Sequence, residues 1–303
     1  MARAVLVTGD SSSTLPVFDA PSDGELTNAI VRAYHDSGVV ILENFVDVAA
    51  CRRLQARANE LIDRFDPAEV RSVFSTTEQT QLDDRYFIES GDKIRFFLEA
   101  DAFDEQGELR QSKENSLNKM GHAMHDLDPV FEEFSHSVAL DNIARGLGVK
   151  DPGVIQSMYI FKPPRIGGEV VFHQDSTYIY TEPESCIGFW FAVEDATLEN
   201  GCMHFIPGGH AGPLRERNKR TGEYSLATEV LDTTPWDESK TLPAEAKAGT
   251  LVVFNGRAPH MSPPNTSDKS RQAYTLHVID KACDYPASNW LQRSADLPLR
   301  GFV

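Results

Sequence analysis

Hydrophobic residues in the first part of the chain recur at the spacing of an amphipathic helix. Leu26, Ile30 and Tyr34 share one face of a predicted helix over residues 23–37. A second apolar stripe at the same spacing consists of Leu54, Ala58, Leu61, Ile62 and Phe65. Between the two stripes, residues 39–42 form a continuous apolar run that is typical of a buried strand. The pattern therefore predicts an opening in the order helix, strand, helix.

The hydrophobic pattern changes near residue 150. Short runs rich in β-branched and aromatic residues alternate there with Gly, Pro and Asn, at 154–161, 169–172, 186–193, 202–206, 226–231, 250–254 and 271–279. Such spacing predicts an antiparallel sandwich or barrel. The helices of the first half, including a third one from about Asp128, would cover one face of the sheet. Residues 207–247 form a long, charged insertion within the β-rich part.

The domain organisation follows from the same pattern. Residues 1–22 are rich in Ser, Asp and Pro, and we expect them to be a flexible lead. No later linker divides the chain, so we expect one domain over residues 23–303. It would be mainly β with flanking helices, and its β core would begin at about residue 150.

Composition narrows the classes of partner. The chain of 303 residues has a net charge of −17, and the basic footprint of nucleic-acid binding is missing. Its four cysteines show no CxxC spacing, which favours reduced thiols in an intracellular protein. The first residues hold too short an apolar run for a signal peptide, and no stretch approaches the roughly 20 apolar residues of a membrane span. We expect a cytoplasmic protein with no nucleic-acid or membrane partner.

The segment His173-Gln174-Asp175 follows a predicted strand. Residues i and i+2 of an extended segment point to the same side, so an imidazole and a carboxylate can converge on one ion. The pattern alone is weak, because a chain with nine histidines matches it easily by chance. A hydrogen-bonded turn histidine explains it equally well. A metal site requires a further ligand from elsewhere in the chain.

Residues downstream strengthen the metal interpretation. A predicted strand over 250–254 leads to His260 and Ser262, and Arg271 opens the last strand. Two histidines and one carboxylate on one face of an iron octahedron leave positions open for a chelating co-substrate and O2. An arginine across the sheet suits the distal carboxylate of a dicarboxylate such as 2-oxoglutarate. A zinc or manganese site of the cupin isomerase type remains an alternative.

The chain resembles the phytanoyl-CoA dioxygenase family. The matching segments follow one another in order at 90–97, 118–123, 156–162, 167–170, 173–175, 193–202, 205–208 and 270–275. The resemblance implies a double-stranded β-helix, which is the jelly roll of cupin-like proteins. It also implies Fe(II), 2-oxoglutarate and O2 as cofactor and co-substrates. The implied iron ligands are His173, Asp175 and His260. The implied contacts to 2-oxoglutarate are Lys93, Met158, Trp190, Ser262 and Arg271.

Without the resemblance, several of these residues have simpler explanations. Lys93 stands in a charged run and reads as a surface lysine. Met158 would be ordinary core packing, and Trp190 a core aromatic whose indole N–H needs a partner. His122 and His125, three residues apart, could bind a metal if helical, or could line a substrate pocket.

The expected function is hydroxylation of an unactivated C–H bond in a small organic molecule, with 2-oxoglutarate decarboxylated to succinate and CO2. Lipid-like acids, their coenzyme A thioesters and secondary metabolites of terpenoid or alkaloid type are all open as substrates. Desaturation, oxidative rearrangement and endoperoxide formation remain alternative outcomes. A non-catalytic barrel that only binds ligands is the alternative from another class. The oligomeric state, including a homodimer, is left open by the sequence.

Overall fold

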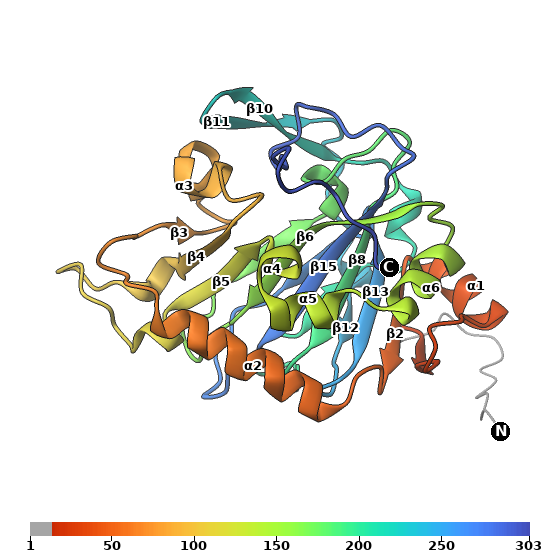
Figure 1. The fold of residues 1–303 in the computed structure, drawn as a ribbon, viewed down its shortest axis with the longest axis horizontal. Coiled ribbons are helices and arrows are strands. Elements are labelled where there is room, and N and C mark those ends of the chain that lie inside the picture. Colours follow the sequence, from red (N-terminus) through yellow and green to blue (C-terminus); the bar gives the residue numbers. More distant parts are fainter. Residues whose placement is uncertain (1–13) are drawn as a thin grey trace.

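Two of three β-sheets form the centre of the computed structural model, which describes residues 14–303 (Figure 1). The large sheet has nine strands in the order β1 (Val17–Asp19), β2 (Val39–Glu43), β13 (Leu251–Asn255), β8 (Ile187–Ala192), β15 (Ala273–Asp280), β6 (Pro152–Ile160), β5 (Leu117–His122), β4 (Ile94–Glu99) and β3 (Val73–Phe74). The smaller sheet has the order β12 (Leu242–Ala244), β9 (Met203–Phe205), β14 (His260–Ser262) and β7 (Val170–His173). The hairpin β10 (Glu216–Gly222) and β11 (Ser225–Val230) stands apart from both.

The two larger sheets face each other and enclose a buried cluster. Strands β13, β8, β15 and β6 pair antiparallel. From this sheet, Trp190 and Val252 pack toward Met203 and Phe205 of the smaller sheet. Alternation along each strand sends the other residues to the opposite face. This arrangement confirms the predicted double-stranded β-helix.

Helices cover the outer face of the large sheet (Figure 1). They are α1 (Asn28–Ser37), α2 (Val48–Asp63), α4 (Met124–Leu127), α5 (Pro129–Ser135) and α6 (Val138–Gly146). The short helix α3 (Arg85–Ile88) lies elsewhere, and its Phe87 lines the cavity described below. Leu54 of α2 and Phe131 of α5 belong to one buried cluster with Phe191 and Tyr274 of the sheet. Full burial of such a side chain contributes roughly 1.5–3 kcal/mol, so this layer fixes the sheet that carries the cavity.

Local capping explains where the helices differ from expectation. The first helix ends at Ser37 as predicted but begins at Asn28, because the Thr27 side chain accepts a hydrogen bond from the backbone N–H of Ile30 at 3.4 Å. Asp23 instead accepts from the N–H of Glu25 in a turn. The third predicted helix is two helices, because Ser137 caps α6 separately from α5.

The predicted lead of residues 1–22 falls partly outside the described residues. Within the described part, Leu15 is buried and residues 17–19 form β1, which pairs in parallel with β2. The prediction of a flexible lead is therefore wrong for residues 14–22. The single domain over residues 23–303 stays a prediction.

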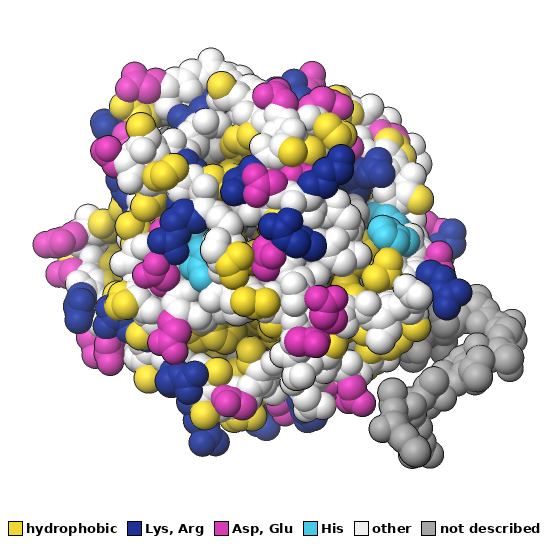
Figure 2. Space-filling view, turned by 45° about the vertical axis from the view of Figure 1, so that its right-hand side comes forward, with side chains coloured by type: hydrophobic (Ala, Val, Ile, Leu, Met, Phe, Trp, Pro, Cys, Tyr) yellow, Lys and Arg dark blue, Asp and Glu magenta, His cyan; other side chains and the backbone are white. Residues whose placement is uncertain are grey.

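The surface is mixed in charge on the face that Figure 2 shows. Lys and Arg side chains lie between Asp and Glu side chains there, without a continuous basic stripe. Among the helices of the described chain, none is long and apolar enough to cross a membrane.

Candidate metal centre and its cavity

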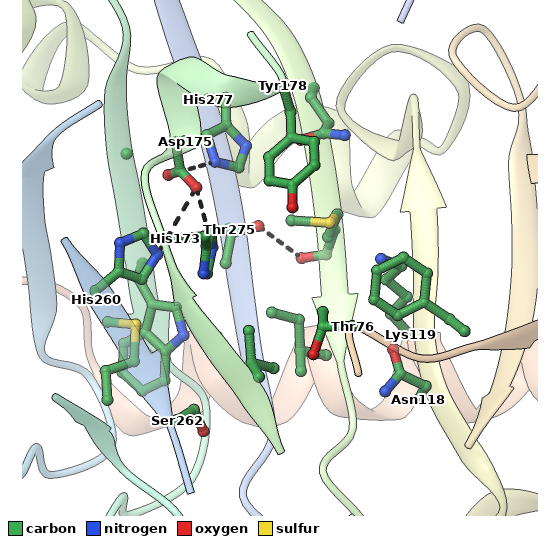
Figure 3. Close-up of a pocket in the computed structure, with 18 of the residues that line it drawn as sticks. Thr76, Asn118, Lys119, His173, Asp175, Tyr178, His260, Ser262, Thr275 and His277 are labelled. Carbon is green, nitrogen blue, oxygen red and sulfur yellow. Dashed lines mark hydrogen bonds and ion pairs between the residues drawn. The ribbon is translucent and has the colours of Figure 1, made fainter. Parts of the chain in front are cut away.

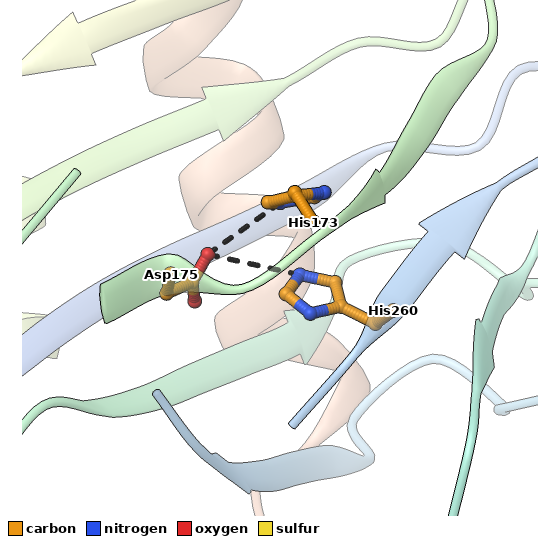
Figure 4. Close-up of side chains that lie close together, drawn as sticks. All are labelled: His173, Asp175 and His260. Atoms are coloured by element: carbon orange, nitrogen blue, oxygen red, sulfur yellow. Dashed lines mark ion pairs between the residues drawn. The ribbon is translucent and has the colours of Figure 1, made fainter. Parts of the chain in front are cut away.

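Three side chains with metal-binding atoms converge where β7 and β14 meet (Figure 4). His173 ends β7, His260 begins β14, and the two residues pair directly, with ring centroids 4.2 Å apart. Asp175 follows two residues after His173, at the start of a 3-10 turn (Asp175–Thr177). Its Oδ1 lies 3.5 Å from Nε2 of His173 and 3.7 Å from Nε2 of His260. One ligand atom from each side chain lies within 4.8 Å of the others, so the three could hold one ion.

The backbone fixes both imidazoles in the tautomer that a metal requires. Nδ1 of His173 lies 2.9 Å from the carbonyl oxygen of Val171, and Nδ1 of His260 lies 3.0 Å from that of Ala258. A carbonyl oxygen only accepts, so each Nδ1 carries the hydrogen and each Nε2 keeps its lone pair. Burial, followed by the neighbouring His173, lowers the pKa of His260 to about 4. His260 is therefore neutral at physiological pH.

A third histidine orients the carboxylate. Nε2 of His277 donates to Oδ2 of Asp175 at 2.8 Å, which leaves Oδ1 facing the other two histidines (Figure 3). Burial alone would raise the pKa of Asp175, but His277 and His260 outweigh it and hold that pKa well below its usual value. His277 comes from β15, so a residue of the large sheet orients the carboxylate that follows β7 of the smaller sheet. Sequence reasoning missed this residue, and a histidine within an apolar strand was the available signal.

A cavity of about 170 Å³ lies between the two sheets beside these side chains. Trp190 of β8, Thr275 of β15 and Met158 of β6 stand in register across its wall. The structure thus brings the predicted residues Met158 and Trp190 into the same cavity as His173, Asp175 and His260.

Arg271 and Ser262 also line this cavity. Arg271 is 2% exposed, its Nε donates to the carbonyl oxygen of Gly201 at 3.2 Å, and its Nη2 donates to Oγ of Ser262 at 3.0 Å. Its Nη1 has no hydrogen-bond partner among the described residues. Burial lowers the pKa of Arg271 to about 10, so it stays cationic at neutral pH. A buried cation with an unpaired N–H fits a carboxylate, because such a group is costly to leave unsatisfied.

The structure does not bring Lys93 to this group. Its side chain is 46% exposed, and its Nζ donates to Oδ1 of Asp92 and to the carbonyl oxygen of Glu89. In the described chain the cavity is lined instead by Lys119 of β5 and by Lys162. Lys93 directly precedes β4 and lies at the surface. This agrees with the interpretation of Lys93 as a surface lysine, which the charged run predicts without the family resemblance.

Sequence reasoning did not identify three buried ionisable residues of the cavity lining, which are Lys119, Lys162 and Glu99. Nζ of Lys162 donates to the carbonyl oxygen of Gly168 at 2.7 Å, and that of Lys119 lies 3.0 Å from the ring centroid of Phe74. Burial holds the pKa of both lysines well below its usual value. Glu99 is 1% exposed, and burial raises its pKa to about 7, partly offset by hydrogen bonds from Asn118 and Gly168.

Glu99 makes the stability of the protein depend on pH. Its pKa of about 7 in the folded state exceeds the ordinary 4.5, so its contribution is present below pH 4.5 and is lost as pH rises through 7. Glu99→Gln mimics the protonated form, and we expect the variant to gain stability over the unchanged protein as pH rises from about 5.5 to about 8.5. Urea unfolding at both pH values measures this. A stability difference that is the same at both pH values would contradict it, and exposed Glu105→Gln is the matched control.

The fold defines the class first. The overall structure resembles that of EctD from S. alaskensis, solved with 2-oxoglutarate and 5-hydroxyectoine, at a TM-score of 0.59 and 16% identity, over 100% of this chain and 99% of that one. It also resembles the epimerase SnoN, solved with Fe3+, alpha ketoglutarate and nogalamycin RO, at a TM-score of 0.61 and 15% identity. The match covers 88% of this chain and 89% of that one. At such identities the likeness shows a shared jelly-roll fold.

Sequence relatives then define the family. The model of the phytanoyl-CoA dioxygenase (PhyH) family matches residues 34–273. Phytanoyl-CoA dioxygenase of Arabidopsis thaliana is 43% identical over 272 residues, 89% of this chain and 95% of that one. Phytanoyl-CoA dioxygenase domain-containing protein 1 of Bos taurus is 43% identical over 282 residues, which cover 90% of this chain and 97% of that one. The chain belongs to the phytanoyl-CoA dioxygenase family. With the His-Asp-His group, this confirms the predicted dioxygenase that uses Fe(II) and 2-oxoglutarate.

Proposed function

We propose that this enzyme hydroxylates an unactivated C–H bond of a small organic molecule and converts 2-oxoglutarate to succinate and CO2. The observation that carries the proposal is the convergence of two imidazole Nε2 atoms and one carboxylate oxygen at the cavity wall. Two histidines and a carboxylate leave open positions on iron for a chelating keto acid and for O2. The bound iron and co-substrate supply the activation of O2.

The chain's own residues have separate roles in this proposal. His173, Asp175 and His260 hold the iron. Nη1 of Arg271 pairs with the distal carboxylate of 2-oxoglutarate, beside Oγ of Ser262. The Ser262 hydroxyl now donates to the carbonyl oxygen of Gly201 at 2.9 Å and would turn toward the carboxylate.

The remaining lining supports the co-substrate. Met158 and Trp190 pack along it, and Lys119 takes the part that the resemblance assigned to Lys93. The carboxylate of Asp175 occupies a coordination position that a halide would need, which favours hydroxylation over halogen transfer.

Succinate formation tests the proposal directly. The purified protein, supplied with Fe(II), 2-oxoglutarate and O2, is expected to form succinate, and omission of any one of the three should stop it. Mass spectrometry of succinate and calorimetry of 2-oxoglutarate binding provide the readouts. Binding of iron and 2-oxoglutarate without any succinate would instead support a barrel that binds ligands and does not turn over.

A further inference from the structure

Gln174 stands between two of the iron ligands but faces away from the cavity. Its backbone is extended, with φ −120° and ψ 133°, and successive side chains of an extended segment point to opposite sides. His173 and Asp175 therefore turn toward the cavity, whereas Gln174 is not among the described residues that line it. The Gln174 side chain is nevertheless 1% exposed. A polar side chain buried so deeply needs hydrogen-bond partners within the protein.

The Gln174 amide makes three hydrogen bonds, each to the main chain of a different residue. Its Nε2 donates to the carbonyl oxygen of Arg257 at 2.9 Å and to that of Pro213 at 3.2 Å. Its Oε1 accepts from the backbone N–H of Arg215 at 3.0 Å. Carbonyl oxygens only accept and a backbone N–H only donates, so one orientation of the amide satisfies all three groups. These contacts join residues 173–175, which we call the ligand segment, to two distant parts of the chain.

The contact with Arg257 leads to the third iron ligand. Arg257 lies in the turn between β13 and β14, and the carbonyl oxygen of the next residue, Ala258, holds Nδ1 of His260 at 3.0 Å. In the same turn, the carbonyl oxygen of Gly256 accepts from the backbone N–H of Ser176 at 2.9 Å. The chain at the ligand segment is thus fastened twice to the turn that orients the His260 ring.

Strand pairing near the triad is short and irregular. His260 pairs with His173, but the register shifts before Ser262 pairs with Val170. The two strands, β14 and β7, have three and four residues. A register irregularity disrupts the ladder locally, so few backbone hydrogen bonds remain to hold the two imidazoles at a fixed separation. The Gln174 amide supplies a separate connection between the same two segments.

The contacts with Pro213 and Arg215 lead to the insertion at residues 207–247. Arg215 directly precedes β10, and its carbonyl oxygen accepts from the backbone N–H of Leu231 at 2.7 Å, which closes the base of the β10–β11 hairpin. The hairpin reaches the cavity, because Asn218 of β10 lines it. The same amide therefore also fixes the base of the hairpin relative to the ligand segment.

We propose that Gln174 is a positioning residue of the iron centre. It acts through Arg257 on the turn that orients His260, and it thereby sets how far the third ligand lies from the other two. Its side chain faces away from the cavity in which iron, 2-oxoglutarate and substrate would bind. This inference rests on the iron site of the proposed function and identifies the residue that holds the two parts of that site together.

Gln174→Met tests the inference through metal affinity. Methionine keeps a side chain of similar length and removes all three hydrogen bonds. Residues that support metal ligands contribute about 10–100-fold to metal affinity, so we expect the Fe(II) affinity to fall by about 10–100-fold. The affinity is measured by competition with a chelator, without O2 and without 2-oxoglutarate, so that it does not depend on turnover. Thermal unfolding is measured on the same protein without metal.

Asn200→Leu is the matched control, because Asn200 is also a buried amide with three main-chain partners. It is 4% exposed, its Oδ1 accepts from the N–H of Thr197 at 2.7 Å, and its Nδ2 donates to the carbonyl oxygens of Asp195 at 2.8 Å and Ser270 at 3.3 Å. None of these partners belongs to the triad. Both variants should unfold at a lower temperature, but the Fe(II) affinity should fall in Gln174→Met and stay unchanged in Asn200→Leu.

Amide hydrogen exchange shows where the effect lies. The N–H of Arg215 is held by Gln174 itself, so its exchange in the iron-free protein should become faster in Gln174→Met. Exchange at residues 255–260 should become faster as well, because the turn loses its contact with the amide. Neither change is expected in Asn200→Leu.

Gln174→Asn keeps the amide on a shorter side chain and decides the question if Gln174→Met does not fold. Its Fe(II) affinity should lie below that of the unchanged protein and above that of Gln174→Met. Unaltered Fe(II) affinity in a folded Gln174 variant, or an equal loss in Asn200→Leu, would overturn the inference. Succinate formation by the unchanged protein, together with unaltered Fe(II) affinity in Gln174→Met, defeats this inference alone. Absence of succinate formation by the unchanged protein defeats the proposed function.

Discussion

Replacement of Asp175 by alanine is expected to abolish iron-dependent succinate formation while the fold is kept. Asp175 supplies the carboxylate of the triad, and its Oδ1 faces both histidines. Loss of a residue that merely supports a metal ligand costs about 10–100-fold in affinity or activity, so loss of the ligand itself should exceed about 100-fold. His173→Ala should lose succinate formation to a similar extent, because it also removes a ligand of the triad. Bound iron, the rate of succinate formation and thermal unfolding are measured together.

His204→Ala is the matched control for this experiment. His204 lies on β9, opposite Met261 of β14, but it does not line the cavity in the described structure, and its Nδ1 contacts the carbonyl oxygen of Cys202. The His204→Ala substitution removes an imidazole from the same sheet without changing the triad, so the rate of succinate formation should stay near that of the unchanged protein. Full activity in Asp175→Ala would refute the metal assignment, as would unaltered iron content with normal turnover in His173→Ala.

The parts of the site that depend on local spacing were predictable from sequence. His173 and Asp175 are two residues apart, and extended backbone places such residues on one side. His260 could be joined to them only through its strand and through the spacing to Arg271. The direct pairing of His260 with His173 across β14 and β7 explains why that inference succeeds.

The parts that depend on long-range pairing were not predictable. Lys93 directly precedes the short strand β4 and Lys119 lies within the short strand β5, and the sequence does not show which of the two lysines is buried. Lys119 is covered because β5 lies between β4 and β6 inside the large sheet, whereas Lys93 precedes the strand. The same reason hid Glu99 and His277, since an alternating pattern does not reveal which face meets the smaller sheet.

Replacement of Arg271 by alanine is expected to raise the 2-oxoglutarate requirement steeply. Arg271 is fully enclosed, and its unpaired Nη1 is the donor that a distal carboxylate would meet. Removal of one partner of a buried, hydrogen-bonded charge pair costs about 2–5 kcal/mol, which corresponds to roughly 30-fold to several thousand-fold in affinity. The KM for 2-oxoglutarate, measured from succinate formation, and the Kd from calorimetry should both rise by that amount.

Arg271→Lys separates charge from shape in the same position. Lysine keeps the positive charge but loses the planar fork, so its KM should lie between those of the unchanged protein and Arg271→Ala. Iron content should stay normal in both variants, because Arg271 contacts Gly201 and Ser262 and none of the triad. Circular dichroism checks that loss of those two contacts does not unfold the chain. An unchanged KM in a folded Arg271→Ala variant would place the distal carboxylate elsewhere, with Lys119 and Lys162 as the remaining cations of the described cavity lining.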